Sequence, residues 1–240
     1  MLISIGELSK VFKVSPRKVL HVGAHLAEEY EEMRKFGWGV DGVIWVESQE
    51  ALCDLINSRF SGTNNKVICA TVWSEDNVKK VFHENINTQC SSLFELGILK
   101  ELSPEMVEVN SREVATRKID SIVSTQDHID FINLDIQGSE LEALKGAIKT
   151  LSTVKWVYTE VNRKEIYKSC PLIEEIDLFL TAQGFSRAAT RWSFREDWGD
   201  ALYVRNQNVF RSIQFKIKEL TSTKLLTLRY RLHDLKASLR

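Results

Sequence analysis

IDFINLDIQGSEL, at residues 129–141, is the stretch that decides the fold, because it predicts a strand, a polar tip and a helix start. Phe131, Ile132 and Leu134 form the short apolar run that is typical of a parallel strand buried on both faces. Asp135 follows where that strand should end, and open α/β sheets bind ligands at the carboxyl ends of their strands. Asp135 is therefore a candidate functional residue; the alternative is a polar loop residue that caps the next helix.

The residues after this tip predict a helix. Ser139 and Glu142 have the spacing of a capping box. Apolar side chains then recur at helical spacing, with charged ones between them: Leu141, Leu144, Ile148 and Leu151. The pattern favours an amphipathic helix.

Strand and helix patterns alternate along the chain. We expect strands at Lys18–Gly23, Gly42–Glu47, Lys66–Trp73 and Lys155–Val161, helices at 25–36, 49–59 and 171–184, and an antiparallel hairpin of Phe185–Phe194 with Ala201–Val204. Residues 77–128 are harder to interpret, with strands predicted near Lys79–His83 and Ala115–Val123 around a polar loop at 89–92. At least four alternations favour an α/β fold: a doubly wound, mostly parallel, Rossmann-like sheet that ends in the hairpin.

The chain divides into three parts. Residues 1–16 predict an N-terminal helical arm, and residues 17–205 the Rossmann-like domain. Residues 206–240 carry eight Lys or Arg side chains against two acidic ones, which predicts a basic helical appendage. Its role stays open between docking on its own domain, a homo-oligomer contact, and peripheral attachment to an anionic membrane or an acidic partner.

Composition excludes several classes of protein. A formal net charge of −1 on 240 residues gives no overall field that would draw the chain to nucleic acid. No apolar run approaches the ~20 residues of a membrane helix, and no signal peptide is visible. The four cysteines form no CxxC pair and show no zinc-site spacing with histidine. We expect reduced thiols, a cytoplasmic location and no metal.

The turn after the first strand discriminates between cofactors. It lacks GxGxxG, and four carboxylates crowd the start of the next helix: Glu28, Glu29, Glu31 and Glu32. A dinucleotide rests its pyrophosphate on such a helix N-terminus, where these carboxylates would repel it. S-adenosylmethionine carries no phosphate and has a cationic sulfonium, so the turn favours it over NAD. Gly23 would permit a close backbone approach to the ligand.

Glu47 ends the second predicted strand, about 20 residues beyond the glycine turn. Acidic residues at this spacing accept hydrogen bonds from ribose hydroxyls, so we expect Glu47 to hold the cofactor ribose. The alternative is a solvated glutamate at the end of a strand.

Several motifs together resemble the FkbM family of methyltransferases. They are VLHVGAH at 19–25, IWVE at 44–47, NLDIQGSELEALKGA at 133–147 and TEVN at 159–162. The resemblance spans roughly residues 17–205. It implies an S-adenosylmethionine-dependent enzyme that O-methylates a hydroxyl, often on a sugar, a glycan or a natural product. The family's usual first turn is Asp-Val-Gly-Ala-Asn-x-Gly, in which His21, His25 and Ala27 here replace the aspartate, the asparagine and the second glycine.

These observations together predict the residues that bind the cofactor. We expect contacts from His21, Gly23, Ala24, His25, Glu47, Ser48, Ala70, Thr71 and Asp135. The glycine turn would admit the methionine end, and the segment at 70–72 would flank the adenine. His21, inside a strand, has a hydrogen-bonded core residue as its alternative.

Two carboxylates are the catalytic candidates. A hydroxyl is a poor nucleophile at neutral pH, so a base that removes its proton accelerates methyl transfer, and positioning the acceptor oxygen is a large part of catalysis. Asp135 is the first candidate for either task, and Glu160, at the end of the next strand, is the second. Adjacent parallel strands lie ~4.8 Å apart, so both would line one crevice. They could instead share Mg²⁺, but with only two carboxylates we favour metal-free chemistry.

Other features leave alternatives open. An aromatic cluster in the terminal hairpin would form an acceptor wall or simply pack the hairpin: Trp192, Phe194, Trp198 and Tyr203. The altered first turn keeps open a catalytically inactive binding or scaffold module. A nucleotide-dependent oxidoreductase is the third hypothesis.

Overall fold

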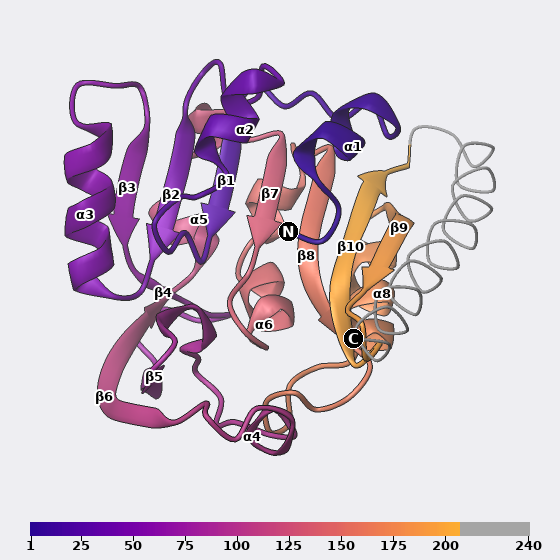
Figure 1. The fold of residues 1–240 in the computed structure, drawn as a ribbon. Helices are drawn as coiled ribbons and strands as arrows, with labels where there is room; N and C mark the ends of the chain where they lie inside the picture. The colour runs from indigo at the N-terminus through magenta and orange to yellow at the C-terminus, as the bar shows by residue number, and fades with distance from the viewer. Residues whose placement is uncertain (207–240) are drawn as a thin grey trace, which may run out of the picture.

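The computed structural model describes residues 1–206, and its core is one seven-stranded sheet (Figure 1). The strand order is β3 (Lys66–Cys69), β2 (Val43–Glu47), β1 (Val19–Val22), β7 (Phe131–Leu134), β8 (Trp156–Asn162), β10 (Trp198–Arg205) and β9 (Phe185–Trp192). The first five strands run parallel, and β10 and β9 run antiparallel. The expected doubly wound, mostly parallel sheet with a terminal antiparallel hairpin is confirmed.

Helices cover both faces of this sheet, which explains why its central strands are apolar on both sides. One face packs against α1 (Ile5–Lys10), α2 (Tyr30–Lys35) and α3 (Glu50–Phe60). The other packs against α5 (Ile119–Ile122), α6 (Glu140–Lys145), α7 (Ile148–Leu151) and α8 (Ile173–Ala182). Alternation along each strand divides the core: Val19 and Phe131 face the first layer, and Leu20 and Ile132 face the second.

A second, three-stranded sheet lies beyond the carboxyl ends of the parallel strands (Figure 1). Its order is β4 (Thr71–Val72), β6 (Glu108–Arg117) and β5 (Lys79–Asn85), and the short helices η1 (Thr88–Cys90) and α4 (Leu99–Leu102) follow β5 in sequence. The expected continuous strand at 66–73 is wrong, because the chain leaves the main sheet after Cys69 and pairs with β6 from Thr71. This sheet places side chains over the strand ends where ligands bind.

The predicted capping box after β7 is also wrong. The Ser139 hydroxyl makes no hydrogen bond, and Glu142 binds Ser74 and Lys145 instead. The buried Glu140 carboxylate accepts the Ile136 and Gly138 N–H groups, which holds the loop before α6. The single helix expected through residue 151 is divided between α6 and α7, with Gly146 between them. A side chain at Gly146 would place its Cβ 2.4 Å from the Trp73 carbonyl oxygen, so close packing explains this glycine.

The N-terminal arm packs on the sheet rather than standing apart. Ile3, Ile5 and Leu8 are buried in the same core cluster as α2 and α3. The Glu7 carboxylate pairs with the Arg191 guanidinium of β9 at 2.7 Å. The predicted appendage at 206–240 lies outside the described residues, apart from residue 206. Within residues 1–206, no helix has the length and apolarity to cross a membrane.

Candidate active site

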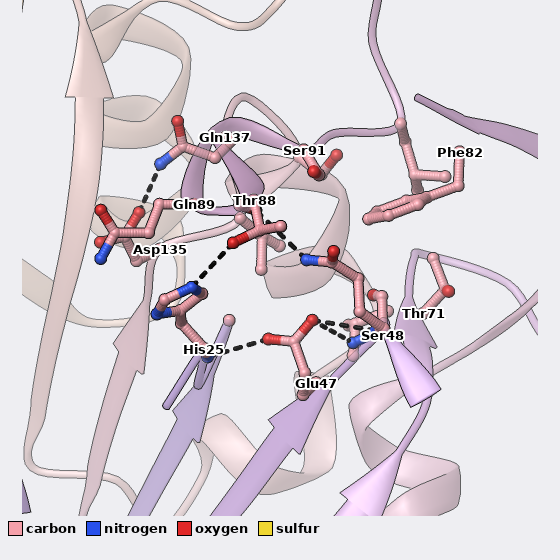
Figure 2. Close-up of a pocket in the computed structure, with 16 residues that line it drawn as sticks. His25, Glu47, Ser48, Thr71, Phe82, Thr88, Gln89, Ser91, Asp135 and Gln137 are labelled. Atoms are coloured by element: carbon pink, nitrogen blue, oxygen red, sulfur yellow. Dashed lines mark hydrogen bonds between the residues drawn. The ribbon is translucent and has the colours of Figure 1, made fainter. Parts of the chain in front are cut away.

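A cleft opens at the carboxyl ends of β1, β2 and β7, between the main sheet and the small sheet (Figure 2). About 490 Å³ of space lies between its lining atoms, part of it open to solvent. Its lining is Gly23, His25, Glu47, Ser48, Gln49, Thr71, Val72, Phe82, Thr88, Gln89, Ser91, Leu93, Asp135, Ile136, Gln137 and Ser139.

Glu47 is the best-supported side chain of this cleft. Its Oε1 accepts hydrogen bonds from the N–H groups of Ser48 and Gln49, at 2.8 and 2.9 Å, and its Oε2 accepts from the His25 N–H at 2.9 Å. The side chain is only 6% exposed. A carboxylate offers about four lone-pair positions, so three backbone donors leave roughly one for a ligand hydroxyl.

The glycine at the first strand end is required by packing. Gly23 has a φ of +83°, and a Cβ there would lie 1.8 Å from the Asp135 carbonyl oxygen. The absence of a side chain at Gly23 therefore lets its backbone approach the neighbouring strand end at Asp135. A close approach of Gly23 to the ligand stays a prediction. His25 and Ala27 follow with φ values of 45° and 57°. Left-handed conformations at two non-glycine residues make this turn unusually tight.

The His25 side chain joins the turn to the short helix η1. Its Nδ1 lies 2.5 Å from a Glu28 carboxylate oxygen. Its Nε2 lies 3.0 Å from the Thr88 hydroxyl (Figure 2). Gln49 adds a second link, from its side-chain amide to the Thr88 carbonyl at 3.2 Å. These bonds hold η1 over the strand ends.

A second cavity adjoins the cleft on the side of β8 and β10. Its lining is Met1, Leu2, Gly23, Ala24, His25, Glu28, Glu29, Gln89, Cys90, Leu99, Asp135, Gln137, Glu160, Ile166, Trp198 and Asp200. Five residues line both spaces: Gly23, His25, Gln89, Asp135 and Gln137. Two ligands, one in each space, would therefore meet beside Asp135.

Asp135 and Glu160 converge at this junction, as adjacent strands β7 and β8 require. The Gln137 amide nitrogen donates to Asp135 Oδ1 at 2.6 Å and to Glu160 Oε2 at 3.0 Å. Burial raises the pKa of Asp135. Burial, and then repulsion from Asp135, raise the pKa of Glu160 well above its usual range. Such a pair holds protons to a higher pH than free carboxylic acids do.

Two further buried carboxyl groups surround the pair. Asp200, on β10, accepts a hydrogen bond from the Tyr158 hydroxyl at 2.6 Å, and burial raises the pKa of Asp200 to about 6. Burial likewise raises the pKa of Glu140 to about 7. Across residues 1–206, none of Asp135, Glu160 and Asp200 forms an ion pair with Lys or Arg.

Most of the predicted site residues lie at these two spaces. Gly23, His25, Glu47, Ser48, Thr71 and Asp135 line the cleft, whereas Ala24 and Glu160 line the adjoining cavity. His21 lines neither: it is 2% exposed inside β1, and its Nε2 lies 2.9 Å from the Asn133 side-chain nitrogen. Ala70 also lines neither, and contributes backbone bonds to Glu47 and Ser48. Cofactor contact by each residue stays a prediction.

The four aromatic residues of the predicted cluster lie in different surroundings in the structure. Trp198 lines the second cavity, Trp192 and Tyr203 pack in the core, and Phe194 is 58% exposed. The wall interpretation therefore fits Trp198 alone.

Sequence reasoning missed the residues that come from outside the parallel strands. Phe82, Thr88, Gln89, Ser91 and Leu93 reach the cleft from the small sheet and the segment after it. Asp200 reaches the cavity from an antiparallel strand. Gln137 lies in the polar tip after β7, two residues after Asp135. A polar side chain so close to a candidate carboxylate was the signal that could have identified it. In the described part of the chain, no three His, Cys, Asp or Glu side chains group closely enough to hold a metal ion.

Comparison with known proteins settles the family. The methyltransferase FkbM domain matches residues 21–187, well over half of the chain. The chain belongs to the FkbM methyltransferase family. Family membership supports S-adenosylmethionine as the cofactor of this FkbM protein.

Solved structures agree with the fold. The FkbM methyltransferase of Methylobacillus flagellatus KT superposes with a TM-score of 0.55 at 18% identity, covering 85% of this chain and 47% of that one. The proposed tRNA (m1A22) methyltransferase Sp1610 of Streptococcus pneumoniae superposes with a TM-score of 0.51 at 12% identity, covering 97% and 86%. This FkbM chain thus spans about half the length of the Methylobacillus protein. No curated protein matches its sequence.

Proposed function

We propose that this protein is an S-adenosylmethionine-dependent O-methyltransferase that acts on a hydroxyl of a sugar, a glycan or a natural product. The observation that carries the proposal is the meeting of two adjoining spaces beside Asp135. A methyl donor in one space and an acceptor in the other would place their reacting atoms next to a carboxyl group.

The cleft suits the chemistry of S-adenosylmethionine. Glu47 would accept a hydrogen bond from a ribose hydroxyl with its remaining lone pair. Val72, Phe82 and Ile136 offer apolar surface for the adenine. The carboxylates of the first turn favour a cationic sulfonium and disfavour a pyrophosphate, which weakens the oxidoreductase alternative.

The second cavity suits an uncharged acceptor with several hydroxyls. Its lining holds five carboxyl groups, those of Glu28, Glu29, Asp135, Glu160 and Asp200, and no Lys or Arg among the described residues. Carboxylates accept hydrogen bonds from hydroxyls and repel phosphates. Trp198 adds an aromatic surface for the apolar face of a sugar ring. The lining supports a glycan or polyol over a nucleic acid or a phosphorylated compound.

The chain's residues would divide the work as follows. S-adenosylmethionine supplies a methyl group on a positively charged sulfur that is a good leaving group. Asp135 orients the acceptor hydroxyl and takes its proton, and Glu160 lies beside it as the second proton-holding group. The two spaces hold the acceptor in line, which removes much of the entropic barrier.

Binding and transfer assays test this proposal. Calorimetric titration should show binding of S-adenosylmethionine and S-adenosylhomocysteine and no binding of NAD. Transfer of a labelled methyl group to polyhydroxyl acceptors should follow, and it should persist in EDTA. Cofactor binding without transfer to any tested acceptor would favour the inactive scaffold module. Activity lost in EDTA and restored by Mg²⁺ would overturn the metal-free chemistry.

We place the enzyme in the cytoplasm, since its four cysteines are all free in the structure. Its basic segment at 206–240 would serve as a homo-oligomer contact or as a peripheral attachment to an anionic membrane. Each basic side chain near such a surface would contribute ~1 kcal/mol.

A further inference from the structure

Gln137 joins the two candidate catalytic carboxyl groups through one nitrogen atom. An amide NH₂ group carries two hydrogens, and here one is directed to Asp135 and the other to Glu160, at 2.6 and 3.0 Å. The two acceptor oxygens are therefore no farther apart than the sum of these distances. No other described side chain donates to either carboxylate.

The orientation of this amide follows from its partners. The Gln137 Oε1 lies 2.6 Å from the Tyr167 hydroxyl, which must donate to it. A rotated amide would direct its oxygen at two carboxylates and its nitrogen at a hydroxyl hydrogen. In the observed orientation the amide nitrogen donates to both carboxylates while the amide oxygen accepts from Tyr167.

The backbone of Gln137 is held as firmly as its side chain. Its φ is 56°, a left-handed value that costs energy for a non-glycine residue. The Ser92 hydroxyl donates to the Gln137 carbonyl at 2.6 Å. Gly138 follows with a φ of +100°, and a Cβ there would lie 3.0 Å from the Cys170 Cβ. The fold therefore fixes this amide between the strand ends.

We infer that Gln137 is a positioning residue: its amide holds Asp135 and Glu160 side by side as a proton-sharing pair that faces the acceptor cavity. A neutral double donor is suited to this task. A lysine would bind both carboxylates as ions and weaken them as bases, and an ionised glutamate would repel both.

The inference deepens the proposed function and rests on it for its catalytic consequence. As the acceptor oxygen bonds to the methyl carbon, the carbon–sulfur bond breaks with its electron pair left on sulfur. The hydroxyl proton then passes to Asp135, with Glu160 and the Gln137 amide stabilising the charge that remains. The pair returns the proton to solvent after product release.

The electrostatic surroundings of the pair are acidic. The titratable groups that act on it come from every neighbouring element: the amino group of Met1, His21, Glu29, Cys90, Glu140, Tyr167 and Asp200. Burial raises the pKa of Asp135, and burial followed by repulsion from Asp135 raises the pKa of Glu160, whereas the Gln137 hydrogen bonds lower the pKa of both groups. Removing this donor should therefore move the titration of the pair to higher pH.

Carbon-13 NMR of labelled Asp and Glu carboxyl groups tests the inference without cofactor or acceptor. Asp135→Asn and Glu160→Gln assign the two resonances. In the wild-type protein we expect two separated titration steps, as coupled groups give, with the upper step above the usual ~4.3 of glutamate. Gln137→Met keeps the side-chain length without the donor, and should raise the steps by ~1 pH unit, a tenfold weaker ionisation.

Gln89→Met is the matched control, because Gln89 lines the same two spaces and its side-chain nitrogen donates to Glu28, at 3.4 Å. It should leave both steps unchanged. If Gln137→Met does not fold, Tyr167→Phe releases the amide and should shift the steps in the same direction. Independent titration of the wild-type carboxyl groups near 4, or equal effects of the Gln137 and Gln89 variants, would overturn the inference.

The titration also separates this inference from the proposed function. Two coupled titration steps in a protein that does not bind S-adenosylmethionine would support the Asp135–Glu160 pair and refute the proposed methyl transfer. Once an acceptor is known, Gln137→Met should lower kcat and shift its pH profile, with the KM for S-adenosylmethionine nearly unchanged. An unaltered pH profile would contradict a positioning role.

Discussion

Two carboxylate corners of the same strand-end surface are built in opposite ways. At the β2 end, Glu47 accepts three backbone N–H groups and holds the loop around it. At the β7 and β8 ends, Asp135 and Glu160 share a single side-chain amide. The first carboxylate accepts from three backbone donors, whereas the two carboxyl groups of the second corner accept from one side-chain donor. We propose that the first corner binds the cofactor and that the second takes part in proton transfer.

The largest effect is expected from a substitution that removes the Glu47 carboxylate. Glu47→Ala removes the acceptor of three backbone donors and of a ribose hydroxyl, so S-adenosylmethionine affinity should fall by roughly 2–4 kcal/mol. Calorimetric titration of the folded variant measures this. Glu50→Ala removes a glutamate that lines neither space and should change nothing. Unchanged affinity in Glu47→Ala would place the ribose elsewhere.

The next effect addresses the proton-transfer corner. Asp135→Asn keeps the shape of the side chain and removes its basicity, so turnover should fall by ~10² or more. Cofactor affinity should stay within a few-fold, as a titration of the same preparation shows. Asp54→Asn, an exposed substitution on α3, is the control. Wild-type turnover in Asp135→Asn would make Asp135 only a loop residue that shapes the strand end.

A smaller effect concerns the acidity around the second corner. The folded pKa of Asp200, about 6, lies above its unfolded value of ~3.9. Its contribution to stability is therefore present below the unfolded pKa and is lost as pH rises through the folded one. Between pH 5 and 8 the wild-type protein should lose about 1 kcal/mol more stability than Asp200→Asn. Urea denaturation at both pH values measures this, and parallel pH dependences would refute it.

The smallest expected effect comes from removing the basic tail, which should leave both carboxylate corners unchanged. Every proposed site residue precedes residue 207, so truncation after Asn206 should leave S-adenosylmethionine affinity within twofold. A large loss would mean that the tail completes the cleft. Co-sedimentation with anionic liposomes at low and high salt tests the tail itself. Pelleting of the full chain at low salt alone supports membrane attachment, and no pelleting of either protein favours oligomerisation.

The two corners also differ in how far sequence predicts them. Strand periodicity places Glu47, Asp135 and Glu160 at neighbouring strand ends, because parallel strands bring their carboxyl ends together. The bond from Gln137 to both carboxylates depends on a left-handed backbone and one rotamer, which no periodicity records. Sequence patterns therefore predict where the charged side chains lie, but they do not predict which groups these side chains bind.

The small sheet shows a second limit. β6 is largely exposed and β5 is mostly half-buried or exposed, so they lack the apolar runs that mark the parallel strands. Thr71 and Val72 continue the apolar pattern of β3 across Ala70, although they pair with a different sheet. Long-range strand pairing therefore decides that residues 66–69 and 71–72 belong to different sheets. The Ser139–Glu142 spacing fails for a similar reason, because Glu140 binds the loop before α6 instead.

A crystal structure of the complex with S-adenosylhomocysteine tests the central claim most directly. The account predicts a ribose hydroxyl hydrogen-bonded to Glu47, the adenine against Val72 and Phe82, and the sulfur beside Asp135, facing the carboxyl-lined cavity. A ligand bound outside this cleft, or a sulfur directed away from Asp135 and the adjoining cavity, would contradict it.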